Sequence, residues 1–336
     1  MRVSVLGAGI AGLACALELR ARGAEVEVLE REAAGAARGA SWFAGGMLAP
    51  WCEAENSGPR IAALGLEGLP WWAQRLPATC FRGTLVVAHA RDRGELAQFS
   101  RRTGGCESVD GAAIAALEPE LAGRFSDGLY FAREAHLDPR AALAALQGQL
   151  ARSGVAMRFG TEGPVPPQPL RVQVDCRGFA ARAALPQLRG VRGEMLVLRQ
   201  PEITLSRPVR VLHPRLPVYV VPRAPGIFMV GATMLESESQ GPVTARSVME
   251  LLAAAYALHP AFAEAEILET GAALRPAFAD NLPRLLWRGN TLHVNGLYRH
   301  GFLLAPALAR RAAQAVLEGR HFPEVTDEDP GERRLA

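Results

Sequence analysis

The chain has 336 residues, of which 49% are hydrophobic and 21% are charged, a composition typical of a globular protein of about two domains. Its formal net charge of +3 and its scattered basic residues argue against nucleic acid and anionic membranes as partners, and favour a small molecule. Every basic residue counted as Lys or Arg is an arginine, so chemistry that needs a lysine amine, such as a Schiff base or a P-loop, is excluded.

The cysteines are odd in number and lack the short paired spacings of zinc sites and redox motifs. They are Cys15, Cys52, Cys80, Cys106 and Cys176. Glycines and charged residues interrupt the opening apolar stretch, which does not resemble a secretory signal, and no window approaches the run of about 20 apolar residues that spans a bilayer. We expect a cytoplasmic protein with reduced thiols, no membrane segment and no metal site.

The first element in chain order is an apolar run at residues 3–6, which predicts a buried parallel strand. Three glycines with the spacing G-x-G-x-x-G follow it. A helical pattern covers residues 10–22, and a second strand over residues 24–30 finishes on an acidic residue, about 20 positions after the glycines. Strand, turn, helix, strand and acid together predict the start of a dinucleotide-binding domain.

Each glycine of this turn meets a different physical requirement. Gly7 permits the tight turn, Gly9 lets the backbone approach a pyrophosphate, and Gly12 lets the helix pack closely on the strand. The helix amino terminus offers unpaired N–H groups and a positive dipole end to the phosphates. Glu30 would accept hydrogen bonds from ribose hydroxyls. The alternative is a glycine turn in a doubly wound fold that holds no ligand.

The next segments favour a second type of structure. Residues 38–50 are rich in glycine and small side chains, so they form either a loop that lies against a ring system, with Ser41 available to phosphate or ribitol oxygens, or a plain surface loop. Strands separated by proline and glycine turns are predicted near Thr84, Val209, Tyr219 and Met229. These strands suggest an antiparallel sheet.

Later elements return to the nucleotide domain. Asp138 is predicted to cap a helix over residues 139–154. A buried strand is predicted at residues 171–178, and residues 290–319 predict a strand, a glycine turn and a helix. The nucleotide domain is therefore expected to be discontinuous, and the tail from about Val325 is expected to be disordered.

Taken in order, these segments resemble the FAD-dependent D-amino-acid oxidase superfamily over nearly the whole chain, and within it the thiamine-pathway glycine oxidases most. The motifs that carry the resemblance are "VLGAGIAGLACALEL", "GASWFAGGMLAPWCEAE", "LDPRAAL", "VDCRGFAAR", "GVRGEMLVL", "VYVVPR", "VGATMLESE", "GAALRPAFADNLP" and "GLYRHGFLLAPA". The resemblance implies an α/β fold, α+β overall, with a GR2-type, Rossmann-like FAD-binding domain and a second, antiparallel-sheet substrate domain. It implies an FAD-binding domain at 1–78, 138–186 and 268–336 and a substrate domain at 79–137 and 187–267.

The resemblance also assigns residues to non-covalent FAD. The adenosine diphosphate half is assigned to Gly7, Ala8, Gly9, Ile10, Ala11, Gly12, Glu30 and Arg31. The flavin half is assigned to the loop residues Ser41, Gly45, Gly46 and Met47 and to the helix-start residues His300, Gly301, Phe302 and Leu303. The cysteine through which monomeric sarcosine oxidases attach flavin has no counterpart in the carboxy-terminal third, and their oxygen-activating lysine is absent.

Four residues are assigned by resemblance to the substrate. Arg275 would grip its carboxylate, Tyr219 would support that carboxylate, Arg299 would be a second arginine near it, and Met234 would line the cavity. The planar fork of a guanidinium suits bidentate hydrogen bonds to a carboxylate, and a buried arginine needs an anionic partner. The alternatives are a structural ion pair for Arg275, a solvent-facing or phosphate-binding role for Arg299, and a core position for Met234.

The implied reaction is oxidative deamination of glycine or a similar small amino acid. A hydride leaves the substrate α-carbon for flavin N5, an imine forms, and molecular oxygen reoxidises the flavin to give hydrogen peroxide. The pathway resemblance directs the imine to the thiazole of thiamine. A D-amino-acid or sarcosine-type oxidase, or a dehydrogenase with another electron acceptor, is the alternative on the same fold. A nicotinamide-linked dehydrogenase and a non-catalytic flavin-binding module are the other classes, and the oligomeric state, including a homo-oligomer, stays open.

Overall fold

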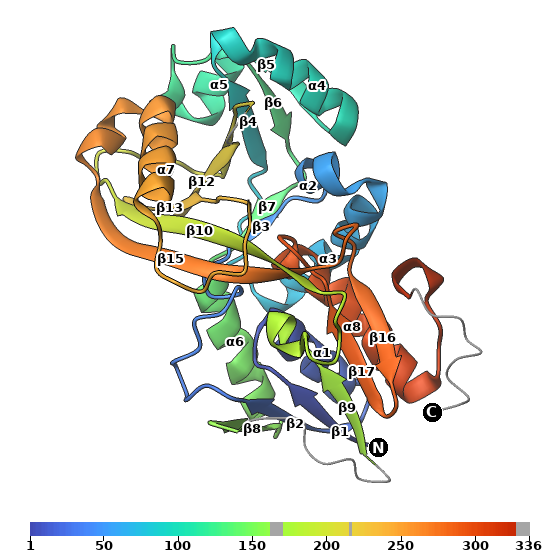
Figure 1. Cartoon of the computed structure of the whole chain (residues 1–336). Helices are drawn as coiled ribbons and strands as arrows, with labels where there is room; N and C mark the ends of the chain where they lie inside the picture. Colours follow the sequence, from blue (N-terminus) through green and yellow to red (C-terminus); the bar gives the residue numbers. More distant parts are fainter. Residues whose placement is uncertain (162–170, 215–216, 327–336) are drawn as a thin grey trace.

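The computed structural model describes residues 1–161, 171–214 and 217–326. In this part of the chain two large β-sheets lie one above the other, with helices around them (Figure 1). The long strands β10 (Arg189–Arg199) and β15 (Glu266–Ala277) belong to the upper sheet and run across the middle of the molecule, on the side that faces the lower sheet.

The lower sheet has the strand order β16-β17-β9-β1-β2-β8. Its strands are β1 (Arg2–Leu6), β2 (Glu25–Glu30), β8 (Ala156–Phe159), β9 (Arg171–Asp175), β16 (Arg284–Arg288) and β17 (Thr291–Asn295). Neighbours pair in parallel except β16, which is antiparallel to β17. The chain extends from β1 toward β2 on one side and toward β9 on the other, so a topological switch point, where ligands bind in such sheets, lies between β1 and β9.

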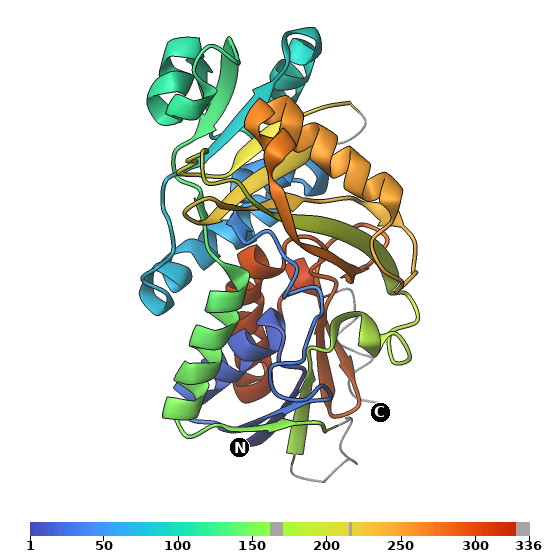
Figure 2. The same ribbon diagram turned by 90° about the vertical axis from the view of Figure 1, so that its left-hand side faces the viewer.

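Helices pack closely beside this sheet. They are α1 (Ile10–Ala21), α3 (Pro59–Arg75), α6 (Pro139–Arg152) and α8 (Gly301–Glu318). Helix α2 (Pro50–Ser57) contacts α3, and its Trp51 and Cys52 pack against side chains of the upper sheet. Helix α1 contacts both α6 and α8. In Figure 2 helix α1 is blue, α6 is green and α8 is red. The predicted strand, turn, helix and strand at the start of the chain are confirmed. The predicted cap is confirmed as well, because Asp138 Oδ1 accepts hydrogen bonds from the N–H groups of Arg140 (2.8 Å) and Ala141 (2.9 Å).

The glycines of the first turn allow the neighbouring backbone segments to pack closely, because they have no side chain. Gly7 has a φ of +94°, which favours glycine. A Cβ atom on Gly12 would lie 1.8 Å from the carbonyl oxygen of Gly7, and one on Gly7 would lie 3.0 Å from the carbonyl oxygen of Cys176. Helix α1 therefore starts directly at the carboxyl ends of β1 and β9.

The upper sheet has the order β14-β10-β13-β12-β11-β4-β6-β5, with β15 paired along β10. The strands not yet given are β4 (Thr84–Ala88), β5 (Glu107–Asp110), β6 (Asp127–Phe131), β11 (Val209–Leu212), β12 (Val218–Ala224), β13 (Ile227–Gly231) and β14 (Leu235–Glu236). The predicted antiparallel sheet is confirmed except at β4 and β11, which pair in parallel. These two strands are far apart in sequence, so no local pattern specifies their direction.

Smaller elements complete the described part. A two-stranded sheet joins β3 (Met47–Leu48) to β7 (Ala135–His136), and the outer helices are α4 (Arg93–Thr103), α5 (Gly111–Leu117) and α7 (Ala245–Leu258). Short 3₁₀ helices are η1 (Ala90–Asp92), η2 (Pro119–Leu121), η3 (Gly178–Ala181), η4 (Pro260–Glu264) and η5 (Pro323–Val325). Helix α7 packs on β10, β12 and β13.

Each half has its own hydrophobic core. One core joins α1, α3, α6 and α8 to the lower sheet, and another joins α7 to the upper sheet. The domain division expected from the sequence stays a prediction. Strand β15 crosses it, because most of its residues fall within the predicted FAD-binding part while the strand pairs with β10 in the upper sheet.

Sequence expectations also concern the carboxy-terminal tail, membrane-spanning helices, cysteines and metal sites. Val325, where the disordered tail was expected to begin, is 2% exposed in η5, and residues 327–336 lie outside the described residues. The described helices include none that is both long and apolar enough to cross a membrane. All five cysteines are free thiols, and the described part holds no cluster of three or more His, Cys, Asp or Glu side chains suited to a metal ion.

Candidate active site

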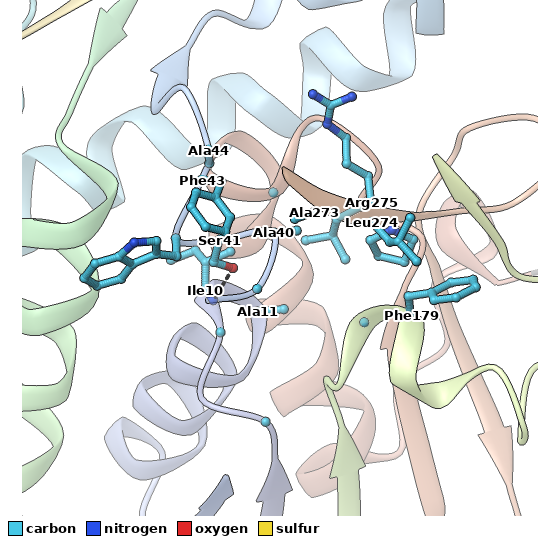
Figure 3. A pocket seen from close by; sticks show the side chains of 18 of the residues that line it. Ile10, Ala11, Ala40, Ser41, Phe43, Ala44, Phe179, Ala273, Leu274 and Arg275 are labelled. Atoms are coloured by element: carbon cyan, nitrogen blue, oxygen red, sulfur yellow. Dashed lines mark hydrogen bonds between the residues drawn. The ribbon is translucent and has the colours of Figure 1, made fainter. Parts of the chain in front are cut away.

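A cavity of about 750 Å³ extends from the carboxyl ends of β1 and β9 to the underside of β10 and β15 (Figure 3). Its floor is the glycine turn, its wall is the loop from Ala36 to Met47, and its far end is closed by residues 297–303. The lower sheet, the upper sheet and the start of α8 all contribute to it. This is the place that the switch-point rule assigns to a ligand.

The floor of the cavity presents backbone N–H groups. The Ala8 N–H donates to Glu30 Oε2 (2.7 Å), and the Ile10 N–H donates to Ser41 Oγ (3.1 Å). A Cβ atom on Gly9 would lie 3.2 Å from that same hydroxyl oxygen. The turn therefore leaves room at Gly9 for a group that comes close to the backbone, and Glu30 and Ser41 border that space.

Two helix amino termini face the cavity. Gly9 caps α1 and His300 caps α8, neither helix has an acidic residue in its first turn, and neither cap side chain accepts a hydrogen bond from the helix. Gly301, Phe302 and Leu303, the first residues of α8, line the far end. The positive ends of two dipoles thus point into one space, an arrangement that fits a ligand with phosphates at one end and an electron-accepting ring at the other.

The upper sheet provides the roof and grips the loop below it. A Cβ atom on Gly45 would lie 2.8 Å from the ring of Tyr219, so only glycine lets this ring settle onto the loop. The Arg223 guanidinium donates to three carbonyl oxygens, those of Leu137 (2.7 Å), Ala44 (2.9 Å) and Gly45 (2.9 Å). Strand β12 therefore fixes the loop against the cavity.

Arg275 projects from β15 at this roof (Figure 3). It is half-buried, and its guanidinium donates to the Thr233 carbonyl (2.9 Å) but forms no ion pair with a described carboxylate. A Cβ atom on Gly193 would lie 2.2 Å from Arg275 Nη2, so the guanidinium lies flat against the backbone of β10. Burial lowers the pKa of Arg275, yet an arginine stays protonated, and its charge faces the cavity without an ion-pair partner among the described carboxylates.

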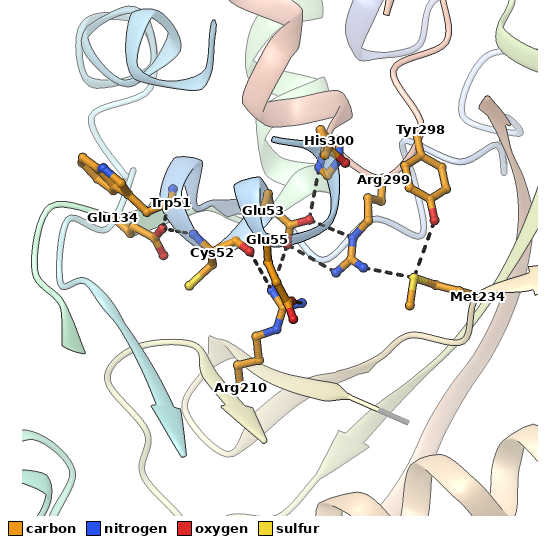
Figure 4. Close-up of polar contacts among 11 residues, drawn as sticks. Trp51, Cys52, Glu53, Glu55, Glu134, Arg210, Met234, Tyr298, Arg299 and His300 are labelled. Carbon is orange, nitrogen blue, oxygen red and sulfur yellow. Dashed lines mark hydrogen bonds and ion pairs between the residues drawn. The ribbon is translucent and has the colours of Figure 1, made fainter. Parts of the chain in front are cut away.

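Arg299 lies nearby in a different environment (Figure 4). Its Nε lies 2.8 Å from Glu53 Oε2, and its Nη1 lies 3.0 Å from the sulfur of Met234. Glu53 also lies 3.1 Å from His300 Nδ1 and 3.3 Å from Arg210 Nη1. One carboxylate from α2 thus joins two arginines and a histidine that come from β11 and from the turn before α8.

The electrostatics of this cluster follow from its burial. Burial alone would raise the pKa of Glu53, but Arg299, His300 and Arg210 outweigh it and hold that pKa well below its usual range. Burial lowers the pKa of His300 despite the opposing effect of Glu53. Burial also disfavours the charged form of Arg299, and the Glu53 carboxylate reverses this and raises its pKa. Glu53 and Arg299 are therefore a charged pair at neutral pH.

A second buried carboxylate supports α2 at its amino terminus. Glu134, from the turn before β7, accepts hydrogen bonds from the N–H groups of Trp51 (3.0 Å) and Cys52 (2.9 Å). Its side chain is fully buried, and this burial raises the pKa of Glu134 to about 7. The helix that carries Glu53 thus depends on a capping carboxyl group whose charge changes near neutral pH.

Most of the residues expected at the site line this one cavity. They are Gly7, Ala8, Gly9, Ile10, Ala11, Glu30, Arg31, Ser41, Gly45, Gly46, Met47, Tyr219, Arg275, Arg299, His300, Gly301, Phe302 and Leu303. Gly12 lies beneath the turn. Met234 was expected to line the cavity but is not among its lining residues; it is 41% exposed beside Arg299, so it is not a core residue either. The alternative of a solvent-facing Arg299 is wrong as well, because its side chain is 10% exposed.

Sequence reasoning missed Glu53, Gly193 and the segment after β9. Glu53 stands in the quoted motif "GASWFAGGMLAPWCEAE", where an acid between apolar residues was a signal for a buried partner of an arginine. The segment from Cys176 to Ala180 lines the cavity because it leaves the carboxyl end of β9, and the switch-point rule could have indicated it. Gly193 gave no signal, since its role depends on a strand 80 residues away.

Glu134→Gln should remove a pH-dependent loss of stability. Glu134 titrates at about 7 in the folded protein and near 4.3 when unfolded, so its neutral form stabilises the fold at low pH and this contribution is lost as pH rises through 7. Glutamine keeps an oxygen acceptor for both N–H groups and stays neutral. Denaturant unfolding should show the variant gaining about 2 to 3 kcal/mol relative to wild type between pH 5 and pH 8.

Glu107→Gln, on the exposed strand β5, is the control for loss of one surface carboxyl group. A difference between Glu134→Gln and wild type that stays constant from pH 5 to pH 8 would contradict the assignment.

Comparisons with known proteins agree with this geometry. The model of the DAO family, FAD dependent oxidoreductase, matches residues 2–315. A Rhizobium etli protein is 57% identical over 325 residues, which cover 96% of this chain and 99% of that protein. It is named as a thiamine biosynthesis oxidoreductase, ThiO. The glycine oxidase of Pseudomonas aeruginosa is 28% identical over 369 residues, 95% of each chain.

Solved structures agree as well. The glycine oxidase of Geobacillus kaustophilus, 24% identical in sequence, has the same fold, with a TM-score of 0.81 over 98% of this chain and 99% of that chain. A cavity floored by a glycine turn, with two helix amino termini directed into it, fits the cofactor of this family. The chain belongs to the DAO family of FAD-dependent oxidoreductases.

Proposed function

We propose that this enzyme oxidises glycine or a similarly small amino acid to the imine, with molecular oxygen as the electron acceptor. The observation that carries the proposal is Arg275, a half-buried cation that faces the cavity without a described carboxylate partner. A small amino acid offers little apolar surface, so its carboxylate must supply most of the binding free energy. The name of the Pseudomonas aeruginosa relative, glycine oxidase, supports the same substrate class.

Different residues along the cavity would bind different parts of the cofactor. The chemistry that bound FAD supplies is two-electron oxidation of the substrate Cα–N bond to an imine, with the electrons passed to oxygen as hydrogen peroxide. Gly7, Gly9 and the α1 amino terminus would hold the pyrophosphate, and Glu30 the ribose. The amino terminus of α8 would lie against the electron-accepting end and favour negative charge there.

At the roof, Arg275 would bind the substrate carboxylate with two parallel hydrogen bonds, and Tyr219 would place its hydroxyl beside it. Both side chains line the cavity, and Tyr219 rests on Gly45 of the loop below. The positive charge of Arg275 disfavours a protonated substrate amine, so the neutral amine that oxidation requires is the form held there. Holding the carboxylate fixes the α-carbon, which is the contribution of the protein to the rate.

FAD is proposed to be held without a covalent bond. Cys176 is the one cysteine among the described residues that line the cavity, and it lies against Gly7, at the pyrophosphate end. His300 at the far end is buried and already engaged by Glu53 and by the Ser57 hydroxyl, 3.1 Å from each. Acid precipitation of the purified protein should release intact FAD into the supernatant. Flavin that remains in the washed precipitate would contradict this.

The imine product is proposed to serve synthesis of the thiamine thiazole, in keeping with the name of the Rhizobium etli relative. A D-amino-acid or sarcosine-type oxidase, or a dehydrogenase with another acceptor, is the second candidate, because a carboxylate clamp binds those substrates as well. Oxygen consumption with glycine, sarcosine and D-alanine ranks the candidates. A preference for glycine supports the proposal, and the absence of oxygen uptake with reduction of an artificial acceptor supports a dehydrogenase.

Replacing Gly9 by valine should abolish retention of FAD. The new side chain starts 3.2 Å from Ser41 Oγ and fills the space where the backbone would meet the pyrophosphate. The control is Gly94→Val in α4, where a Cβ atom meets nothing within 4 Å. The measurement is the ratio of flavin to protein after purification, and a Gly9→Val protein as yellow as the control would exclude the turn from the FAD site.

Arg275→Lys should lower kcat/KM for glycine by about tenfold to a hundredfold, because a lysine cannot form the two parallel hydrogen bonds of a guanidinium. Loss of one charged hydrogen bond costs about 1.5–3 kcal/mol. Arg275→Ala should lose more, with bound flavin unchanged. Arg199→Lys, at an exposed position on β10, is the matched control. Wild-type kcat/KM in Arg275→Ala would exclude the clamp, and loss of flavin would move Arg275 to the cofactor site or the fold.

A further inference from the structure

Two arginines line the end of the cavity beside Tyr219, and they differ in how their charges are compensated. Arg275 has a backbone carbonyl as its described partner, whereas Arg299 is paired with Glu53 at 2.8 Å. The side chains of Arg299 and Glu53 are 10% and 8% exposed, and both residues line the cavity. The cavity therefore presents one available guanidinium at this end and one that is already neutralised.

The pairing of Arg299 is directional (Figure 4). Nε and Nη2 of its guanidinium face the Glu53 carboxylate, at 2.8 and 3.3 Å, and Nη1 faces the Met234 sulfur at 3.0 Å. Met234 is 41% exposed, and its sulfur also lies 3.6 Å from the Tyr298 hydroxyl. Arg299 thus sits between an anion on the inner side and a neutral thioether on the outer side.

The other cation of the cluster does not depend on Glu53 alone. Arg210 Nη1 lies 3.3 Å from Glu53, and its Nη2 lies 3.5 Å from Glu55. Arg210 is 1% exposed on β11, and its guanidinium also lies over the ring of Phe99. Loss of the Glu53 charge would therefore leave Arg210 paired with Glu55, while Arg299 would lose its ion pair among the described carboxylates and keep only the electrostatic effect of Glu55 without direct contact.

We propose that Glu53 is a specificity-determining residue, which neutralises Arg299 and so restricts the site to substrates with a single carboxylate. The inference rests on the proposed function, in which Arg275 binds the one carboxylate of a small amino acid. A second carboxylate on the substrate would find Arg299 occupied and would face the negative charge of Glu53, which is unfavourable in an enclosed site. With Glu53 neutral, Arg299 would become a second anion site in the same cavity.

The test variant is Glu53→Gln in the FAD-loaded enzyme. The ratio of kcat/KM for D-aspartate or iminodiacetate to that for glycine should rise at least about tenfold, the effect of one charge-assisted hydrogen bond. Calorimetric titration gives a readout without turnover: affinity for malonate or succinate should rise by a similar factor, while affinity for acetate should stay within about threefold. No gain for any of these dicarboxylates would overturn the inference.

Two further variants separate charge from structural damage. Glu53→Gln combined with Arg299→Gln should return to the wild-type preference, and a gain that persists in this double variant would also overturn the inference. Glu118→Gln is the matched control, since Glu118 forms a buried pair with Arg207 at 2.8 Å and neither residue lines the cavity. It should leave the ratio of dicarboxylate to monocarboxylate affinity unchanged.

Should Glu53→Gln fail to fold or to retain FAD, Arg299→Met tests the same charge balance from the other side. Glu53 then keeps its charge with one partner fewer, so malonate and succinate should bind more weakly relative to acetate than in wild type. An unchanged ratio would overturn the inference. Failure of the proposed function is distinct: wild-type enzyme would then show no turnover of glycine, sarcosine or D-alanine, whereas the calorimetric comparison would still report on Glu53.

Discussion

The charge on Arg275 is the constraint around which this site is organised. A guanidinium that is half-buried and has no described carboxylate partner is costly unless an anion reaches it, and the cavity is the route by which an anion can arrive. The fold keeps this charge available. Gly193 lets the guanidinium lie on β10, and Glu53 holds the neighbouring Arg299 in a separate pair, so the two arginines do not share one anion.

The loop between the sheets is held by the same kind of interaction. Arg223 binds three carbonyl oxygens of the segments at residues 44–45 and 137, and Arg140 forms a bidentate pair with Glu269 of β15, with both distances 2.8 Å. Arginine suits these places because its planar fork reaches several acceptors at once, which a lysine could not do. In a chain without lysine, guanidinium groups provide both the proposed substrate contact and the hydrogen bonds and ion pairs that connect the upper half to the lower half.

Local patterns predicted the elements that local physics determines. The turn at Gly7 and Gly9, the helix after it, the strand ending at Glu30 and the cap at Asp138 each depend on residues within a few positions of one another, and all are present. Contacts between distant segments were beyond such patterns. Glu53 and Arg299 meet across 246 positions, and β4 and β11 pair in parallel although each alone reads as an ordinary strand. The unpaired state of Arg275 is also invisible in sequence, because it depends on how far the described carboxylates lie from its guanidinium in the folded chain.

Anaerobic addition of glycine to the purified, FAD-loaded enzyme tests the central claim most directly. If the cavity binds a small amino acid through Arg275 and aligns its α-carbon with the flavin, the visible absorbance of oxidised flavin should bleach on addition of glycine and return when oxygen is admitted. A yellow enzyme whose spectrum is unaffected by saturating glycine, sarcosine and D-alanine would contradict the account.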